Sequence, residues 1–136
     1  PMTLSVDSMF SVPRETLDKL RQYEALLVKW QRAINLVGPA SLPEAWDRHF
    51  IDSLQITPLV PDSARTLYDL GSGAGFPGLV LAMARPDLSV TLIESDQRKC
   101  AFLGTVSHET KTPITIHSDR IEKATETLPS PDIITA

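Results

Sequence analysis

One stretch of the sequence, residues 68–78 (YDLGSGAGFPG), places glycines between two apolar runs. Residues 66–70 have the composition of a buried parallel strand, and the apolar residues that follow Pro77 predict a helix. Glycines at such a junction can adopt positive φ angles, and they let backbone amides approach a ligand that a side chain would keep away. The stretch therefore predicts a strand-to-helix turn that holds a nucleotide-like ligand.

The spacing of the glycines narrows the class of ligand. A nicotinamide-binding turn needs its third glycine five residues after the first, and Phe76 stands at that position. The pattern is DxGxGxG, and its Asp69 falls at the carboxyl end of the predicted strand, where open α/β sheets bind ligands. The next apolar run, residues 90–93, ends at Glu94, where an acid would accept hydrogen bonds from ribose hydroxyls. These features together resemble the S-adenosylmethionine site of a class I methyltransferase. The alternatives are a loop that the glycines merely punctuate and a site for another nucleotide.

The rest of the second half of the chain alternates between strand and helix patterns. Strands are expected at 66–70, 89–93, 114–117 and 132–135, and helices at 77–84, 96–108 and 120–127. Such alternation predicts an α/β fold, in which a Rossmann-like parallel sheet is covered by helices on both faces.

The first half of the chain reads as helical. After a mixed segment at residues 2–10, apolar residues recur at helical spacing from Pro13 to about residue 34. Ser41 and Glu44 form a capping-box pattern, which predicts a second helix that runs to about Gln55. Its buried stripe is expected to be Trp46, Phe50 and Leu54.

Two prolines, Pro58 and Pro61, end this second helix. The joint between the two halves is placed at residues 57–65. We therefore divide the chain into a helical N-terminal part, residues 1–60, and an α/β part, residues 61–136.

Composition limits the classes of function. The 136 residues are enough for one domain with a real core, and no apolar run is long enough to cross a membrane. No secretory signal is visible, so a cytoplasmic protein is expected. The single cysteine, Cys100, lies in a helical apolar pattern, and one cysteine makes no metal site. A net charge of −4 does not favour RNA as a partner, but the local field at a cleft decides that question.

Two further segments carry candidate site residues. Arg48 and Asp52 are four residues apart with His49 beside Arg48, and their simplest interpretation is a surface ion pair on a helix. In class I methyltransferases the loop after the third strand lines the adenine-binding site. Residues 119–122 occupy that position here. Acidic residues at the start of a helix are also explained by their favourable interaction with the helix dipole.

Five segments in order resemble one family. They are Trp30 with Asn35-Leu36, RHFIDS at 48–53, DLGSGAGFPG at 69–78, DRIE at 119–122 and DIITA at 132–136. They are similar to the bacterial small-subunit ribosomal RNA guanine-N7 methyltransferases, also called glucose-inhibited division protein B. The resemblance runs from about residue 14 to the end of the chain. It implies methyl transfer from S-adenosylmethionine to N7 of a guanine, with 16S ribosomal RNA or the small ribosomal subunit as partner.

The resemblance, read with the class I pattern, implies a set of site residues. The expected cofactor contacts are Asp69, Gly71, Ser72, Gly73, Gly75, Phe76, Glu94, Asp119, Ile121 and Glu122. The expected substrate contacts are Arg48 to a phosphate or to the cofactor carboxylate, His49 as an orienting or substrate-facing group, and Asp52 as the partner that holds Arg48. The N7 atom of guanine already carries a lone pair, so no general base is needed and no catalytic residue is assigned.

One departure from the family pattern affects these expectations. The family sequence continues beyond the DIITA segment, whereas this sequence stops at Ala136, so we expect a C-terminal truncation and an incomplete sheet in the order 3-2-1-4. The strand at 132–135 would then be an exposed edge. We expect the fragment to lack activity and to self-associate through that strand or be unstable, whereas the full-length form is expected to be a monomer.

Two other functional classes stay open. A class I methyltransferase with another acceptor would share the glycine turn and Glu94, but it has no reason to carry the segment from Arg48 to Ser53. A non-enzymatic cofactor-binding or interaction module is the second alternative, and cofactor affinity would discriminate it.

Overall fold

The computed structural model describes residues 12–136, and the irregular segment expected at residues 2–10 lies outside them. Its centre is a parallel sheet with the strand order β3-β2-β1-β4. The strands are β1 (Thr66–Leu70), β2 (Ser89–Ile93), β3 (Thr115–His117) and β4 (Ile133–Thr135). The predicted α/β fold and the predicted strand order are confirmed.

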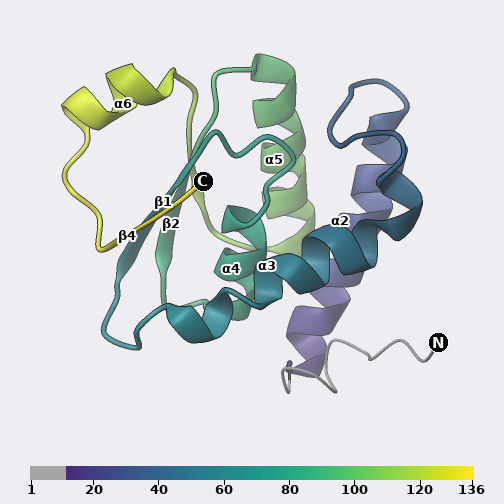
Figure 1. Ribbon diagram of the computed structural model, residues 1–136, viewed down its shortest axis with the longest axis horizontal. Coiled ribbons are helices and arrows are strands. Elements are labelled where there is room, and N and C mark those ends of the chain that lie inside the picture. The colour runs from purple at the N-terminus through teal and green to yellow at the C-terminus, as the bar shows by residue number, and fades with distance from the viewer. Residues whose placement is uncertain (1–11) are drawn as a thin grey trace.

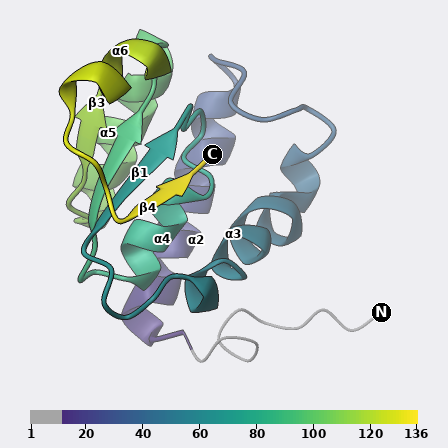
Figure 2. The same ribbon diagram turned by 60° about the vertical axis from the view of Figure 1, so that its left-hand side comes forward.

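The helices form layers on the two sides of this sheet. Helices α4 (Gly78–Ala84) and α5 (Gln97–Thr110) cover one face, and α6 (Ile121–Thr127) lies on the opposite side (Figure 1). Helix α2 (Arg14–Gln31) packs against α4 and α5 from outside and adds a further layer (Figure 2). On the side of α4, two layers of helices therefore cover the sheet.

The register of the two central strands decides where the candidate site forms. Strand β1 pairs with β2 in parallel, and Leu70 lies opposite Ile93 at the carboxyl ends of both. The residues that follow, Gly71 and Glu94, therefore leave the sheet side by side. This edge is the place where α/β sheets bind their ligands.

The segment between α2 and the sheet differs from the single helix expected from Ser41 to Gln55. It consists of a 3₁₀ turn at Leu42–Glu44, a π-helical stretch at Trp46–Ile51, the short helix α3 (Asp52–Leu54) and a second 3₁₀ turn at Thr57–Leu59. The predicted capping box is wrong, because Ser41 has helical backbone angles and its hydroxyl donates backward to the carbonyl of Gly38 at 2.8 Å. A capping serine needs an extended backbone to reach forward to the helix amides.

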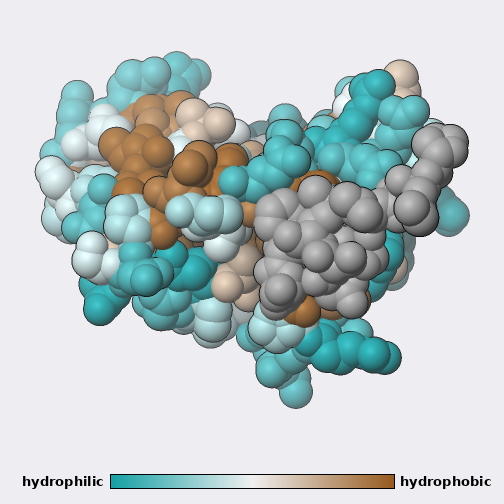
Figure 3. Space-filling view, turned by 60° about the horizontal axis from the view of Figure 1, so that its bottom comes forward, coloured by the Kyte–Doolittle hydropathy of each residue, from teal (hydrophilic) through white to brown (hydrophobic). Residues whose placement is uncertain are grey.

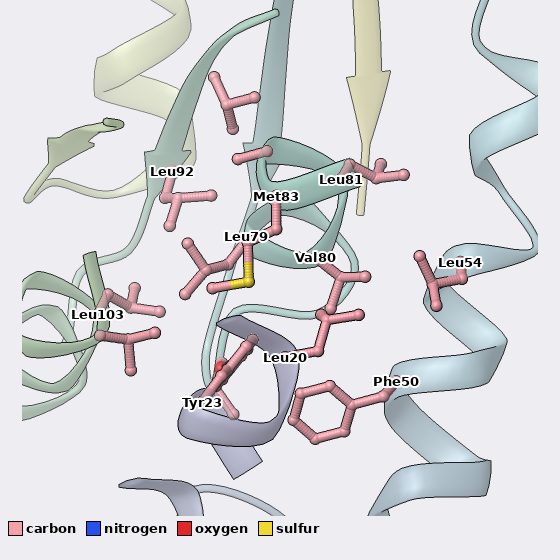
Figure 4. Close-up of a cluster of buried hydrophobic side chains, with 14 of the residues drawn as sticks. Leu20, Tyr23, Phe50, Leu54, Leu79, Val80, Leu81, Met83, Leu92 and Leu103 are labelled. Atoms are coloured by element: carbon pink, nitrogen blue, oxygen red, sulfur yellow. Dashed lines mark hydrogen bonds between the residues drawn. The ribbon is translucent and has the colours of Figure 1, made fainter. Parts of the chain in front are cut away.

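The hydrophobic core joins the helical half of the chain to the sheet. Helix α4 is buried along Gly78–Met83, with the sheet on one side and α2 and α3 on the other. Figure 4 shows Leu20 and Tyr23 of α2 beside Phe50 and residues of α4. The two halves of the sequence thus contribute to one continuous core.

The surface is mixed in character. Figure 3 shows a hydrophobic patch between hydrophilic regions on one face of the molecule. In the described part of the chain, the large hydrophobic side chains that are exposed are Val28, Leu59, Ile121 and Ile134. Among residues 12–136, none of the helices combines the length and the apolar character needed to span a bilayer.

We expect Leu20→Ala to lower the free energy of unfolding by about 2–5 kcal/mol, because Leu20 is fully buried and its loss leaves a cavity. Leu59→Ala is the matched control, since Leu59 is 77% exposed and its truncation should change stability by less than about 0.5 kcal/mol. Urea denaturation followed by circular dichroism measures both values. Equal losses in the two variants would contradict this account of the core.

Candidate functional site

The turn between β1 and α4 has the conformation that its glycines allow. Gly71, Gly73 and Gly75 have φ angles of 68°, 57° and 102°. The amide of Gly71 donates to the carbonyl of Ile93 at 2.8 Å, which anchors the start of the turn on β2. At Gly75 a side chain is excluded twice, by the positive φ and because a Cβ atom there would collide with the hydroxyl of Tyr23.

Glu94 lies at the end of β2 and reaches back to this turn. Its Oε1 accepts a hydrogen bond from the amide of Gly73 at 2.8 Å, and its Oε2 accepts one from the amide of Asp96 at 2.8 Å. The residue is only 8% exposed. Each carboxylate oxygen has a second lone pair, so Glu94 can accept further hydrogen bonds from hydroxyl donors while it holds the turn.

An open cavity of about 420 Å³ lies next to Glu94. It brings together five of the expected cofactor residues, and its lining is Gly71, Ile93, Glu94, Ser95, Asp119, Arg120, Ile121 and Glu122. Ile121 belongs to α6, and its Cδ1 lies 3.8 Å from the position that a Cβ atom on Gly71 would take. An apolar side chain and a carboxylate therefore line the same cavity.

Asp69 lies beneath the turn and does not line this cavity. It is fully buried, and its Oδ1 accepts a hydrogen bond from the hydroxyl of Thr135 in β4 at 2.6 Å. Its Oδ2 has no hydrogen-bond partner among the described residues, 12–136. A Cβ atom on Gly78 would lie 2.6 Å from the Cβ of Asp69, so only glycine fits at the start of α4. Burial raises the pKa of Asp69, and the Thr135 hydrogen bond partly offsets that rise.

The three expected substrate residues and Phe76 gather at a second cavity, of about 210 Å³. Ser72, Gly73 and Gly75 line neither of the two cavities. Its lining is Arg48, His49, Asp52, Ser53, Ile56, Phe76, Pro77 and Ala136. The ring of His49 stacks on Phe76 with centroids 4.9 Å apart, and its Nε2 lies 3.2 Å from the hydroxyl oxygen of Ser41. Burial lowers the pKa of His49, the neighbouring Arg48 charge lowers it further, and Asp52 opposes the shift.

The expected partnership between Arg48 and Asp52 is wrong. Arg48 Nε lies 2.6 Å from Oε2 of Glu44, which forms its ion pair. Glu44 and Asp52 each stand four residues from Arg48, one on either side, so the spacing alone did not show which of the two acids forms the ion pair. Both residues of this ion pair are more than half exposed, so it contributes little to stability.

Two residues that contact the site were not assigned to it from the sequence. The hydroxyl of Tyr23 in α2 donates to the carbonyl of Ala74 inside the turn, and Thr135 binds Asp69. A tyrosine within a stripe of leucines was a usable signal, because a buried tyrosine hydroxyl needs a partner. Within residues 12–136 there is no cluster of three or more His, Cys, Asp or Glu side chains that could hold a metal ion.

Comparison of the sequence with known proteins finds a matching family and close relatives. The sequence matches the family model described as rRNA small subunit methyltransferase G over residues 16–136. It is 51% identical over 135 residues to the ribosomal RNA small subunit methyltransferase G of Parvibaculum lavamentivorans, covering 97% of this chain and 60% of that protein. It is 56% identical over 126 residues to the protein of the same name from Paramagnetospirillum magneticum, covering 92% and 60%. The chain thus spans about 60% of the length of these relatives.

Solved structures share the fold at lower identity. The O-methyltransferase TomG from Streptomyces achromogenes, in complex with SAM, is 19% identical with a TM-score of 0.57, over 96% of this chain and 59% of that one. A precorrin-6Y C5,15-methyltransferase from Geobacter metallireducens is 14% identical with a TM-score of 0.56, over 75% and 50%. These likenesses concern the fold.

The raised pKa of Asp69 predicts a pH dependence of stability. The folded state holds the Asp69 proton more tightly than the unfolded state does, whose pKa is near 3.8. The stabilising contribution is therefore complete below pH 3.8 and is lost as the pH rises through the folded-state pKa. Asp69→Asn cannot ionise, so we expect the stability of the variant relative to wild type to increase as the pH rises over this range.

Urea denaturation at a series of pH values measures this difference. Asp87→Asn is the control with the opposite sign, because the hydrogen bond from Arg85 lowers the pKa of Asp87. The relative stability of that variant should decrease as the pH rises. Parallel pH profiles for wild type and Asp69→Asn would show that this carboxyl is not perturbed.

Proposed function

The chain belongs to the rRNA small subunit methyltransferase G family, and we propose that it forms the S-adenosylmethionine-binding part of an enzyme that methylates N7 of a guanine in 16S ribosomal RNA. The observation that carries the proposal is the placement of the Glu94 carboxylate against the amide of Gly73, beside an open cavity. Because the chain spans about 60% of its relatives, the complete reaction is proposed for the whole protein.

The cavity beside Glu94 suits the adenosine part of the cofactor. The free lone pairs of Glu94 accept hydrogen bonds from the ribose hydroxyls, which are paired donors at this position in α/β nucleotide sites. Ile121 offers an apolar surface to the adenine, and Asp119 and Glu122 supply acceptors at the rim. The positive φ angles of the turn leave its backbone open to the remainder of the cofactor.

The second cavity suits the acceptor side of the reaction. We propose that Arg48 contacts a phosphate of the RNA, because its side chain and that of its ion-pair partner Glu44 are both more than half exposed. His49 is held by Phe76 and Ser41, so its ring has a fixed orientation towards the cavity. Asp52 lines the same cavity and adds negative charge there.

Methyl transfer to guanine N7 does not require a side chain that acts as an acid or a base. S-adenosylmethionine, when bound, supplies a methyl group on a positively charged sulfur. Guanine N7 carries a lone pair, so no residue has to remove a proton before the transfer. The residues of the chain therefore act by holding the two reactants in line and by excluding water, which can account for a large share of a methyl-transfer barrier.

The cofactor part of the proposal predicts a binding experiment. We expect this chain to bind S-adenosylhomocysteine saturably in a calorimetric titration, and Glu94→Gln to weaken binding roughly ten- to hundredfold, because a charge-assisted hydrogen bond is lost. Glu109→Gln is the matched control, since Glu109 is exposed near the end of α5. No binding by the folded wild-type chain, or equal binding by Glu94→Gln, would refute the proposed cofactor site.

We further propose that the chain of these 136 residues associates through β4. Within the part of the chain that the structure describes, β4 pairs only with β1, so its outer edge presents backbone groups without a strand partner. Ile134 in this strand is 58% exposed. An open and apolar strand edge is a template for pairing with another strand, and a second copy supplies the same edge.

Ile134→Lys should reduce this association, because a charge at a strand edge opposes edge-to-edge pairing. Size-exclusion chromatography with light scattering over a range of protein concentrations measures the mass. Leu59→Lys, at another exposed position outside the sheet, is the control and should associate as wild type does. A wild-type chain that stays monomeric at high concentration would overturn the proposal.

A further inference from the structure

Tyr23 is a buried residue of α2 that contacts the glycine turn 51 residues further along the chain. Its hydroxyl donates a hydrogen bond to the carbonyl oxygen of Ala74, and its side chain is fully buried. Ala74 lies between Gly73 and Gly75, so this contact reaches the part of the turn with the greatest backbone freedom. A second long-range hydrogen bond to this part of the turn runs from the amide of Gly73 to the carboxylate of Glu94.

The ring of Tyr23 packs against the same turn. It stacks on Phe76 with centroids 5.3 Å apart and planes 10° apart, and it meets Phe50 edge-on at 4.8 Å. The hydroxyl occupies the space that the missing side chain of Gly75 leaves free. The shape of the turn and the position of Tyr23 therefore depend on each other.

The peptide group between Ala74 and Gly75 is held from both sides. Its carbonyl accepts from Tyr23, and its N–H, which points the opposite way in a trans peptide, donates to the carbonyl of Ser72 at 2.7 Å. A glycine-rich turn would otherwise permit this peptide plane to rotate, because neighbouring glycines tolerate both signs of φ. Rotation would break two hydrogen bonds at once.

The Tyr23 hydroxyl is protonated at neutral pH and can therefore donate a hydrogen bond. Burial raises the pKa of Tyr23 well above its ordinary value, and the negative charge of Asp69 raises it further. The hydrogen bond to Ala74 is therefore not lost by ionisation at any ordinary pH.

We propose that Tyr23 is a positioning residue for the cofactor site: it fixes the peptide plane at Ala74–Gly75 so that the amide of Gly73 stays directed at Glu94. This inference rests on the proposed cofactor function of the turn. It makes α2, which lies outside the sheet and its two covering layers, part of the machinery that shapes the site.

Tyr23→Phe tests the proposal because it retains the ring and removes the hydroxyl. Tyr68→Phe is the matched control, since the Tyr68 hydroxyl also donates to a backbone carbonyl, that of Pro129 at 2.7 Å, away from the turn. The first measurement is hydrogen exchange of the Gly73 and Gly75 amides by NMR, compared with the amides of β1 and β2. The second is the affinity for S-adenosylhomocysteine by calorimetry, at a temperature where all variants are folded.

We expect Tyr23→Phe to accelerate exchange of the two turn amides about tenfold relative to the sheet amides, and to weaken binding about tenfold, the scale of one lost hydrogen bond. Tyr68→Phe should change neither ratio. A residue that only stabilised the fold would accelerate turn and sheet amides together.

Turn amides that exchange no faster than the sheet amides in Tyr23→Phe would overturn the inference, and so would a loosened turn with unchanged affinity. If the wild-type chain did not bind S-adenosylhomocysteine, the proposed cofactor function would fail, and the exchange data would still decide whether Tyr23 fixes the turn. The two failures are therefore distinguishable.

Discussion

The geometry of the site depends on the buried carboxylate of Asp69. It receives a hydrogen bond from Thr135 of β4, and it lies so close to Gly78 that α4 can begin there only with a glycine. Three elements thus meet at one charged group, which is placed where burial opposes its ionisation. These contacts link strand β1, strand β4 and the start of helix α4, and the glycine turn connects β1 to α4.

The turn is held from two sides by groups of different chemistry. From the end of strand β2, the carboxylate of Glu94 accepts a hydrogen bond from the amide of Gly73. From the outer helical layer, Tyr23 donates to Ala74 and stacks on Phe76. A loop rich in glycine has a large conformational entropy when free, and fixing it beforehand reduces the cost that a ligand would otherwise meet on binding. The helical half of the chain therefore has a structural relation to the site beyond covering the core.

The sequence was informative where a local pattern has one physical solution. Strands β1 and β2 lie at the predicted residues 66–70 and 89–93, because short apolar runs bounded by turn residues read as buried strands. The helix expected from Ser41 was wrong because a capping pattern does not reveal whether the serine backbone is extended. The contacts Tyr23–Ala74 and Asp69–Thr135 join residues 51 and 66 positions apart, and no local periodicity reports such a distance.

The core shared by α2, the π-helical stretch and α4 also has a consequence for synthesis on the ribosome. Tyr23 and Phe50 emerge early, but their partner Phe76 and the buried helix α4 follow later in the chain. Until then the aromatic faces of the first half have no sheet to cover them, and such exposed surface attracts chaperones and other nascent chains. The N-terminal helices can therefore bury their apolar faces against the sheet only after β1 and α4 have been synthesised.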